Sequence, residues 1–334
     1  MNLADFDFPL PSDLIAQEPS TRRDGSRLLV LRPDGAIEHR TFADLPGHLA
    51  DGDVLVLNNT RVLPARLILR RSTGGRVDAL LVRAAGERTW ETLLDTPRKL
   101  AIGERLKVDD RAWARIAGRT PRGAWILEFE SDVPALAARL GRAPLPPYIR
   151  RDAGPEDLER YQTVYAERDG AIAAPTAGLH FTREMLDALA RRVEIVRVTL
   201  HVGIGTFKPV KTADIDSHRM EPEEYEIAPD AVAVLRRAME SGRRIVAVGT
   251  TTCRTLEAWA RTGQPRGWTD LFIRPPFEFK VVRALLTNFH VPKSTLLMLA
   301  CAFAGRERIL EAYAEAIRLR YRFFSYGDAT LLLR

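Results

Sequence analysis

Between residues 62 and 130, short stretches of alternating apolar and polar side chains follow one another along the chain. Turn-forming segments such as 73–75 and 120–123 separate them, and none of the stretches has a helical period. Alternation with a period of two is typical of strands that bury one face. Six such strands in succession predict a small antiparallel β-barrel. They span residues 65–71, 76–83, 89–94, 104–108, 112–117 and 124–130.

After about residue 154 the pattern changes, and apolar runs alternate with segments of helical period. In segment 229–241, for example, Val232, Leu235 and Met239 fall on one helical face, and Gly242 follows as a stop signal. This alternation predicts a layered α/β domain. The strands are expected at 192–201, 244–248 and 281–289, and the helices at 229–241, 252–261, 294–304 and 307–320.

The N-terminal apolar runs at 27–32, 36–42 and 53–57 predict strands that are too few to form a domain alone. We therefore expect them to join the α/β part of the chain. The resulting prediction is a three-layer αβα domain formed by residues 1–61 and 152–334. The antiparallel β-barrel domain, residues 62–151, would then be inserted into it.

Composition narrows the class of protein. The chain has 334 residues, of which 46% are hydrophobic and 28% charged, a normal balance for a globular protein of two domains. The longest apolar run, 296–304, is far shorter than the ~20 residues of a membrane-spanning helix. The first seven residues are acidic and lack the apolar core of a signal peptide. Cys253 and Cys301 are too few for a disulfide framework. We expect a soluble, cytoplasmic protein with no membrane partner.

The charge balance indicates a class of partner. Fifty Lys and Arg residues against 44 Asp and Glu residues leave a net charge of +6. Basic proteins bind polyanions because cationic side chains that neutralise phosphates release condensed counterions. Taken alone, the charge favours nucleic acid only weakly.

Short motifs exclude several familiar sites. The sequence has no Gly-Lys pair and therefore no phosphate-binding P-loop. Gly203 and Gly205 follow a predicted strand, but Lys208 stands where a dinucleotide fingerprint requires a third glycine. A methyltransferase with a glycine-rich loop after its first strand is disfavoured for the same reason.

Four denser stretches carry the candidate chemistry, and three of them lie at strand ends, where open α/β sheets bind ligands. Each also has a structural interpretation: threonines cap helices, and histidines beside glycine turns are often structural. The three histidines lack metal-ligand spacing, so no metal is predicted. The stretches are 174–182 (Thr176, Gly178, His180), 200–209 (His201, Gly203, Gly205, Thr206), 248–254 (Thr250, Thr251, Arg254) and 286–295 (Asn288, His290, Lys293, Ser294).

Longer motifs, read together, carry a resemblance that covers essentially the whole chain. Segment 58–66 (NNTRVLPAR) resembles the N-terminal hallmark of the S-adenosylmethionine:tRNA ribosyltransferase-isomerase family. Departures are small: Thr252 and Cys253 stand where Ser-Val is expected, and Arg274 where an aromatic residue is common. Further matching segments are 146–149, 161–166, 175–181, 201–208, 288–297 and 321–328.

The resemblance implies an α/β domain with an inserted β-barrel and an activity in queuosine synthesis. It implies that the ribosyl group of S-adenosylmethionine moves onto 7-aminomethyl-7-deazaguanine at the wobble position of tRNA. Rearrangement then yields epoxyqueuosine and releases adenine and methionine. S-adenosylmethionine is thus a substrate, the tRNA is the partner, and no prosthetic cofactor is implied. We expect a monomer.

The reaction needs a base, a cradle for the nucleoside and groups that stabilise oxyanions. We assign proton transfer to the histidines and oxyanion or phosphate binding to Lys293, Asn288 and Ser294. Two rival hypotheses remain: a tRNA-binding protein without catalysis, and an S-adenosylmethionine-dependent tRNA methyltransferase. The predicted catalytic residues are His180, His201, His290 and Lys293. The predicted substrate-binding residues are Thr176, Gly178, Gly203, Gly205, Thr206, Thr250, Thr251, Arg254, Asn288, Ser294, Asn59 and Arg61.

Overall fold

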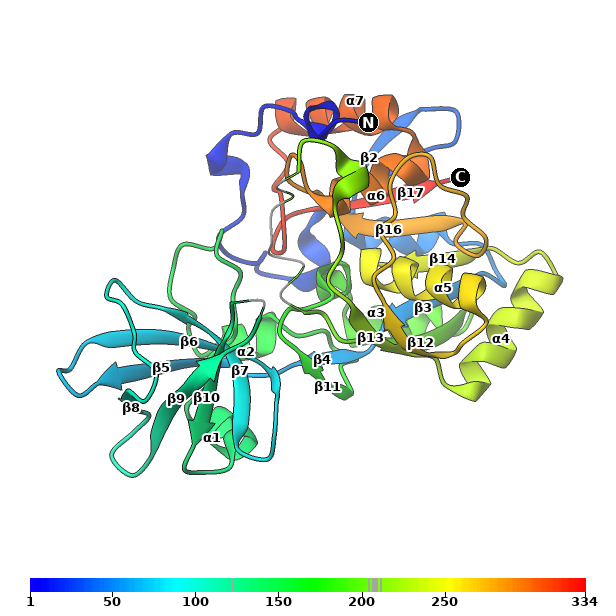
Figure 1. Cartoon of the computed structure of the whole chain (residues 1–334). Coiled ribbons are helices and arrows are strands. Elements are labelled where there is room, and N and C mark those ends of the chain that lie inside the picture. The colour runs from blue at the N-terminus through cyan, green and yellow to red at the C-terminus, as the bar shows by residue number, and fades with distance from the viewer. Residues whose placement is uncertain (122, 204, 206–209, 211) are drawn as a thin grey trace.

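The chain folds around a mixed nine-stranded sheet and a closed six-stranded barrel. The structure, a computed structural model, describes residues 1–121, 123–203, 205, 210 and 212–334 (Figure 1). In the figure the barrel projects to one side of the sheet and its helices. In spatial order the strands of the sheet are β15 (Arg266–Thr269), β13 (Glu223–Glu226), β12 (Glu194–Leu200), β3 (Val54–Asn58), β14 (Ile245–Val248), β16 (Ala284–Asn288), β17 (Ala329–Leu333), β1 (Arg27–Leu31) and β2 (Ile37–Thr41).

The centre of the sheet is parallel. Strands β12, β3, β14 and β16 run in the same direction, so their carboxyl ends meet at one edge. Strand β17 is antiparallel to β16 and parallel to β1, while β2, β13 and β15 complete the two sides as antiparallel strands. The edge that collects the four carboxyl ends is the place where open α/β sheets bind ligands.

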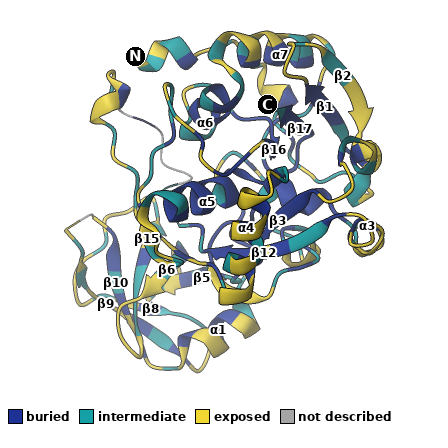
Figure 2. Cartoon of the chain, turned by 90° about the vertical axis from the view of Figure 1, so that its right-hand side faces the viewer, coloured by how far each residue is buried: buried dark blue, intermediate teal, exposed yellow. Residues whose placement is uncertain are grey.

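Both faces of the sheet are covered, which confirms the predicted three layers. In β3, Val54 and Val56 pack into one core, whereas Leu55 and Leu57 pack into the other. Such a continuous apolar run is typical of a strand buried on both faces. Figure 2 shows the central strands as buried. One face carries α4 (Pro229–Glu240), α5 (Thr250–Thr262), α6 (Thr295–Ala304) and α7 (Arg306–Arg318); the other carries α3 (Arg183–Leu189) and the 3-10 helices η4 (Phe42–His48) and η5 (Thr176–His180).

The predicted barrel is also confirmed. All its neighbouring strands are antiparallel, and alternate residues such as Leu67 and Leu69 point into its core. Helix α1 (Val133–Leu140), capped by the Asp132 side chain, packs on this core. The barrel strands are β5 (Arg66–Arg71), β6 (Arg76–Ala84), β7 (Thr89–Asp95), β8 (Arg105–Lys107), β9 (Trp113–Arg119) and β10 (Trp125–Phe129).

A short parallel pair lies where the chain leaves the sheet for the barrel and returns from it. Strand β4 (Thr60–Val62) leads out, and β11 (Arg168–Ala171) leads back beside it. Among the described residues, no helix is both long and apolar enough to cross a bilayer. The other helices in the part of the chain that the structure describes are α2 (Asp157–Arg160), η1 (Leu3–Phe6), η2 (Ser12–Leu14), η3 (Arg23–Gly25) and η7 (Ile215–Ser217).

Several element boundaries differ from the sequence prediction by one to three residues, and two of these differences have a clear physical cause. Strand β16 begins at Ala284 rather than at 281, because the Glu257 carboxylate binds the N–H groups of residues 280, 281 and 282 at 2.9–3.1 Å. Helix α5 begins at Thr250 rather than at 252, because Gly249 with φ of +92° turns the chain sharply after β14. A glycine is needed there, since other residues are strained at such an angle.

Glu257 offers a test of this packing. Its side chain is fully buried, binds three backbone N–H groups and pairs with Arg261 at 2.7 Å. Removing one partner of a buried ion pair leaves the other groups without compensation. We expect Glu257→Ala to lower the free energy of unfolding by about 3–5 kcal/mol in urea denaturation. The matched variant Glu311→Ala, on the exposed face of α7, should change it by less than about 0.5 kcal/mol. Equal effects would contradict this account.

Candidate active site

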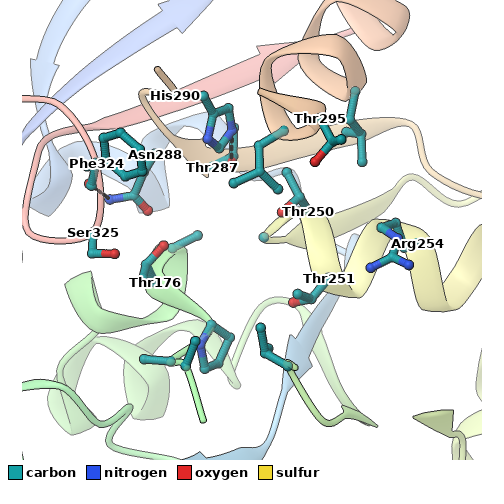
Figure 3. Close-up of a pocket in the computed structure, with 18 of the residues that line it drawn as sticks. Thr176, Thr250, Thr251, Arg254, Thr287, Asn288, His290, Thr295, Phe324 and Ser325 are labelled. Atoms are coloured by element: carbon teal, nitrogen blue, oxygen red, sulfur yellow. Dashed lines mark hydrogen bonds between the residues drawn. The ribbon is translucent and has the colours of Figure 1, made fainter. Parts of the chain in front are cut away.

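A cavity lies at the carboxyl ends of β14 and β16 (Figure 3). Segments far apart in sequence form its walls, as expected for a site at a sheet edge. The described lining consists of residues 173–177, 249–251, 271–273, 287–290 and 324–325 with Tyr148, Tyr161, Val202, Met220, Arg254, Thr295, Leu296 and Leu299.

Thr250 and Thr251 face this cavity from the first turn of α5. A buried asparagine at the end of β3 holds Thr251: Asn58 Nδ2 donates to its hydroxyl at 3.2 Å and to the Leu200 carbonyl at 3.0 Å. The Asn58 carbonyl oxygen accepts the N–H groups of Thr60 and Leu200. Thr251 thus accepts a bond from the protein, and its own O–H can donate to a ligand.

Arg254 also lines the cavity, but its charge is compensated inside the protein. Its guanidinium forms a buried ion pair with Glu223 and donates to the carbonyls of Leu271 and Thr269. The other oxygen of Glu223 accepts the Gly203 N–H at 2.9 Å. The pair therefore joins α5 to β13 and to the residue that begins the glycine stretch. Its net charge is zero, so the wall it forms does not repel a cationic ligand.

His290 is the one histidine that faces this cavity among the described residues. Its Nε2 lies 3.0 Å from the Thr287 hydroxyl, and its backbone N–H donates to the Tyr313 hydroxyl at 3.1 Å. Burial lowers the pKa of His290 to about 3, because the charged imidazolium would lose its hydration. The ring is therefore neutral at physiological pH, the form that can accept a proton.

His180 lies behind the cavity wall rather than in it. Its Nδ1 is 2.7 Å from the Ser26 hydroxyl, and its Nε2 is 3.2 Å from Asn288 Nδ2. The ring stacks on Phe42 with centroids 4.9 Å apart. Burial lowers the pKa of His180 to about 3 as well. The cavity-facing residue here is Asn288, and His180 contacts it from the protein side.

His201 belongs to a different cavity, which lies between the barrel and the sheet. Gly203 lines the same space. The His201 Nδ1 is 2.8 Å from the Thr60 hydroxyl, and burial lowers its pKa. The three histidines predicted to share proton transfer are thus in three different places.

Comparison with known proteins decides the family. A family model described as "Queuosine biosynthesis protein" matches residues 3–332. The chain belongs to this family. It is 50% identical over 338 residues to a protein of Thermotoga petrophila and 52% identical over 345 residues to one of Symbiobacterium thermophilum. Both are named S-adenosylmethionine:tRNA ribosyltransferase-isomerase, and each alignment covers 100% of both chains.

A solved structure of this family is also similar. It is the crystal structure of an S-adenosylmethionine tRNA ribosyltransferase from Thermotoga maritima. The match has a TM-score of 0.57 and 40% sequence identity, and it covers 98% of this chain and 100% of that one. The resemblance stated from the motifs is therefore confirmed.

Lys293 and Ser294 lie outside the cavity lining described for this member of the queuosine biosynthesis family. Lys293 is about half exposed, and its Nζ pairs with Asp7 at 2.7 Å. Ser294 caps α6: it accepts the Leu297 N–H at 3.2 Å and donates to the Val291 carbonyl. Contact of either residue with substrate stays a prediction.

Other predicted binding residues are also distributed away from the cavity. Asn59 lines a third cavity and binds Glu167 and Thr199. Arg61 is exposed and donates to the Ala166 carbonyl. Gly178 is packed so tightly that an added Cβ would lie 2.0 Å from the Tyr165 hydroxyl, and at Gly205 it would lie 3.0 Å from Glu221. Thr206 is outside the described residues. The cavity does bring together Thr176, Thr250, Thr251, Arg254, Asn288 and His290.

Several cavity residues were missed from the sequence. Tyr148, Tyr161, Phe324 and Ser325 lie inside motifs that carried the family resemblance, but nothing local to them indicated a shared cavity. Met220 and residues 271–273 have no sequence signal, since they are apolar residues in irregular segments. Their convergence depends on the tertiary fold alone.

The buried histidines make stability depend on pH in a defined direction. Their folded-state pKa of about 3 lies below the ordinary value of 6.5, so in that window the unfolded chain binds more protons. The free energy of unfolding should therefore fall as the pH drops from 6.5 towards 3. Each histidine should contribute roughly 1 kcal/mol per pH unit between about pH 6 and pH 5.

Urea denaturation at about pH 6 and pH 5 measures this change in the free energy of unfolding. His290→Gln should reduce the dependence on pH by roughly 1 kcal/mol per unit. The partly exposed His48, whose pKa is also lowered by burial, is the control. His48→Gln should change the slope by much less. An unchanged slope in His290→Gln would show that the ring is not held neutral by burial.

Proposed function

We propose that this chain transfers the ribosyl group of S-adenosylmethionine onto 7-aminomethyl-7-deazaguanine at the wobble position of tRNA. The transferred group is isomerised to epoxyqueuosine, and adenine and methionine are released. The observation that carries the proposal is the alignment, at 50% identity and over the full length of both chains, with relatives named for this activity. The cavity at the carboxyl ends of the parallel strands adds a site at the place where open α/β sheets bind ligands.

The chemistry begins at the sulfonium of S-adenosylmethionine. The positive sulfur acidifies the neighbouring C5′ hydrogens, so a base can remove one and form an ylide. Loss of adenine makes the sugar electrophilic, and the aminomethyl nitrogen of the tRNA base attacks it. An alkoxide then closes to the epoxide and expels methionine. The bonds from ribose to adenine and to sulfur break, and one proton is released.

The cavity provides groups suited to these steps. His290 is the histidine that faces the cavity among the described residues, so we assign it the proton transfer. The hydroxyls of Thr250 and Thr251 suit the ribose or a developing oxyanion. The compensated Arg254–Glu223 pair leaves the wall compatible with a cationic sulfonium.

The proposal also covers the domain boundaries, the partner, the oligomeric state and the location of the protein. We take residues 62–151 as the inserted domain, because the barrel has a core of its own. The net charge of +6 supports tRNA as the polyanionic partner. We propose that the chain acts as a monomer in the cytoplasm.

Isotope labelling separates this function from its rivals. S-adenosylmethionine labelled in the ribose and, separately, in the methyl group is supplied with tRNA that carries 7-aminomethyl-7-deazaguanine. We expect ribose label in the tRNA, methyl label in free methionine and adenine released one-to-one. Transfer of the methyl label, or S-adenosylhomocysteine as product, would indicate a methyltransferase. Binding of tRNA without any product would favour the non-catalytic rival. Guanine at the wobble position is the control and should accept nothing, because it lacks the aminomethyl group.

The role of His290 has its own test. His290→Gln should lower kcat by ~10²–10⁴ at saturating substrates, the usual effect of losing a general acid–base group. His48→Gln, on the opposite face of the sheet, should change kcat less than about twofold. If His290→Gln raises KM while kcat is unchanged, His290 binds substrate and does not transfer protons.

A further inference from the structure

The carboxamide of Asn288, at the carboxyl end of β16, is held in one orientation. Its Nδ2 lies 3.0 Å from the backbone carbonyl oxygen of Phe324. A carbonyl oxygen only accepts hydrogen bonds, so the atom that faces it must be the amide nitrogen. Asn288 is 2% exposed, so water does not compete for this bond.

His180 takes the second proton of this nitrogen. Because Nδ2 donates to His180 Nε2 at 3.2 Å, that ring nitrogen must be unprotonated. The ring proton is therefore on Nδ1, which donates to the Ser26 hydroxyl at 2.7 Å. Stacking on Phe42 fixes the ring plane. Both protons of the amide are thus used on the protein side of the wall.

The other end of the same carboxamide is left for a ligand. Asn288 Oδ1 is buried and has no hydrogen-bond partner among the described residues. Figure 3 shows this oxygen pointing into the cavity, on the side where Thr176 and Ser325 lie. Buried carbonyl oxygens are nearly always paired in folded proteins, so an unpaired one in a cavity wall indicates a ligand that donates.

The surroundings of Oδ1 indicate which part of a nucleoside lies there. Phe324 lines this end of the cavity, and its ring packs on Tyr148 with centroids 3.8 Å apart. Thr250, Thr251 and Arg254 lie at the opposite end (Figure 3). A flat, apolar base suits the aromatic end, and a hydroxylated, charged remainder suits the other end.

We propose that Asn288 Oδ1 accepts a hydrogen bond from the exocyclic amine of the adenine in S-adenosylmethionine, with His180 as the positioning residue that fixes the carboxamide. The inference rests on the proposed function, because it takes S-adenosylmethionine as the ligand. It makes Asn288 a determinant of base specificity. A 6-oxo purine would bring a second acceptor against Oδ1 and leave both oxygens unpaired.

The test is competition in the ribosyl-transfer assay with substrate tRNA present. The competitor is S-inosylmethionine, the 6-oxo analogue of S-adenosylmethionine, and its inhibition constant is compared with the KM of S-adenosylmethionine. For the wild-type protein we expect the analogue to bind at least ~100-fold more weakly. In Asn288→Ala the inhibition constant of the analogue and the KM of S-adenosylmethionine should differ less than about threefold. The 2′-deoxy analogue of S-adenosylmethionine serves as a second competitor. The factor by which it binds more weakly than S-adenosylmethionine should be the same in Asn288→Ala as in the wild-type protein.

His180→Ala distinguishes positioning from catalysis. A freed carboxamide should reduce the discrimination between the two bases about tenfold, while kcat with saturating S-adenosylmethionine falls less than tenfold. A general acid–base role would instead lower kcat by ~10²–10⁴ and leave the discrimination intact. His48→Gln is the control and should alter neither quantity.

A measurement on the wild-type protein covers the case in which the variants do not fold. Nitrogen NMR at pH 7 should show His180 as a neutral ring with its proton on Nδ1. A proton on Nε2 would overturn the proposal, since the carboxamide would then have to be reversed. Equal binding of the 6-oxo analogue, or loss of the 2′-deoxy penalty in Asn288→Ala, would overturn it too. Absence of ribosyl transfer by the wild type would instead overturn the proposed function.

Discussion

The burial of the central parallel strands on both faces is the constraint on which the rest of the structure depends. Strands β3, β14 and β16 consist entirely of buried residues. A strand with helices on both faces offers no surface to a ligand, so polar chemistry is confined to its ends. Asn58 and Asn288 are the last residues of β3 and β16, and Gly249 directly follows β14. The site is built where the apolar pattern stops.

Hydrogen bonds and ion pairs between buried polar groups hold that edge together. Asn58 joins the ends of β3 and β12 to the first turn of α5. The Arg254–Glu223 pair joins α5 to β13. Side chains whose orientation is fixed by hydrogen bonds need little reorganisation when a ligand binds. A cavity with compensated charges and a neutral imidazole, that of His290, suits a substrate that already carries a positive sulfur.

Burial and hydrogen bonding also explain why the histidines play different roles. An isolated buried imidazole loses its charge, and hydrogen bonds then decide whether it meets a ligand or supports another residue. His290 faces the cavity, whereas both ring nitrogens of His180 are engaged with Ser26 and Asn288. Three histidines near glycine turns are equivalent in the sequence, but the fold separates them.

The sequence by itself determined the layers and the barrel, because alternation and helical periodicity are local properties that hydrophobic burial enforces. It also singled out Thr250, Thr251, Asn288 and His290, which line the cavity, because these residues lie at or just after the ends of apolar strands. Only the tertiary structure decided that Phe324 and Tyr148 complete the cavity and that His180 and Lys293 lie outside its described lining. It also decided where β16 begins, because Glu257, more than 20 residues away in sequence, binds the N–H groups before it. Contacts between distant segments leave no periodic trace in a sequence, so they become visible only when the sheet has brought the segments together.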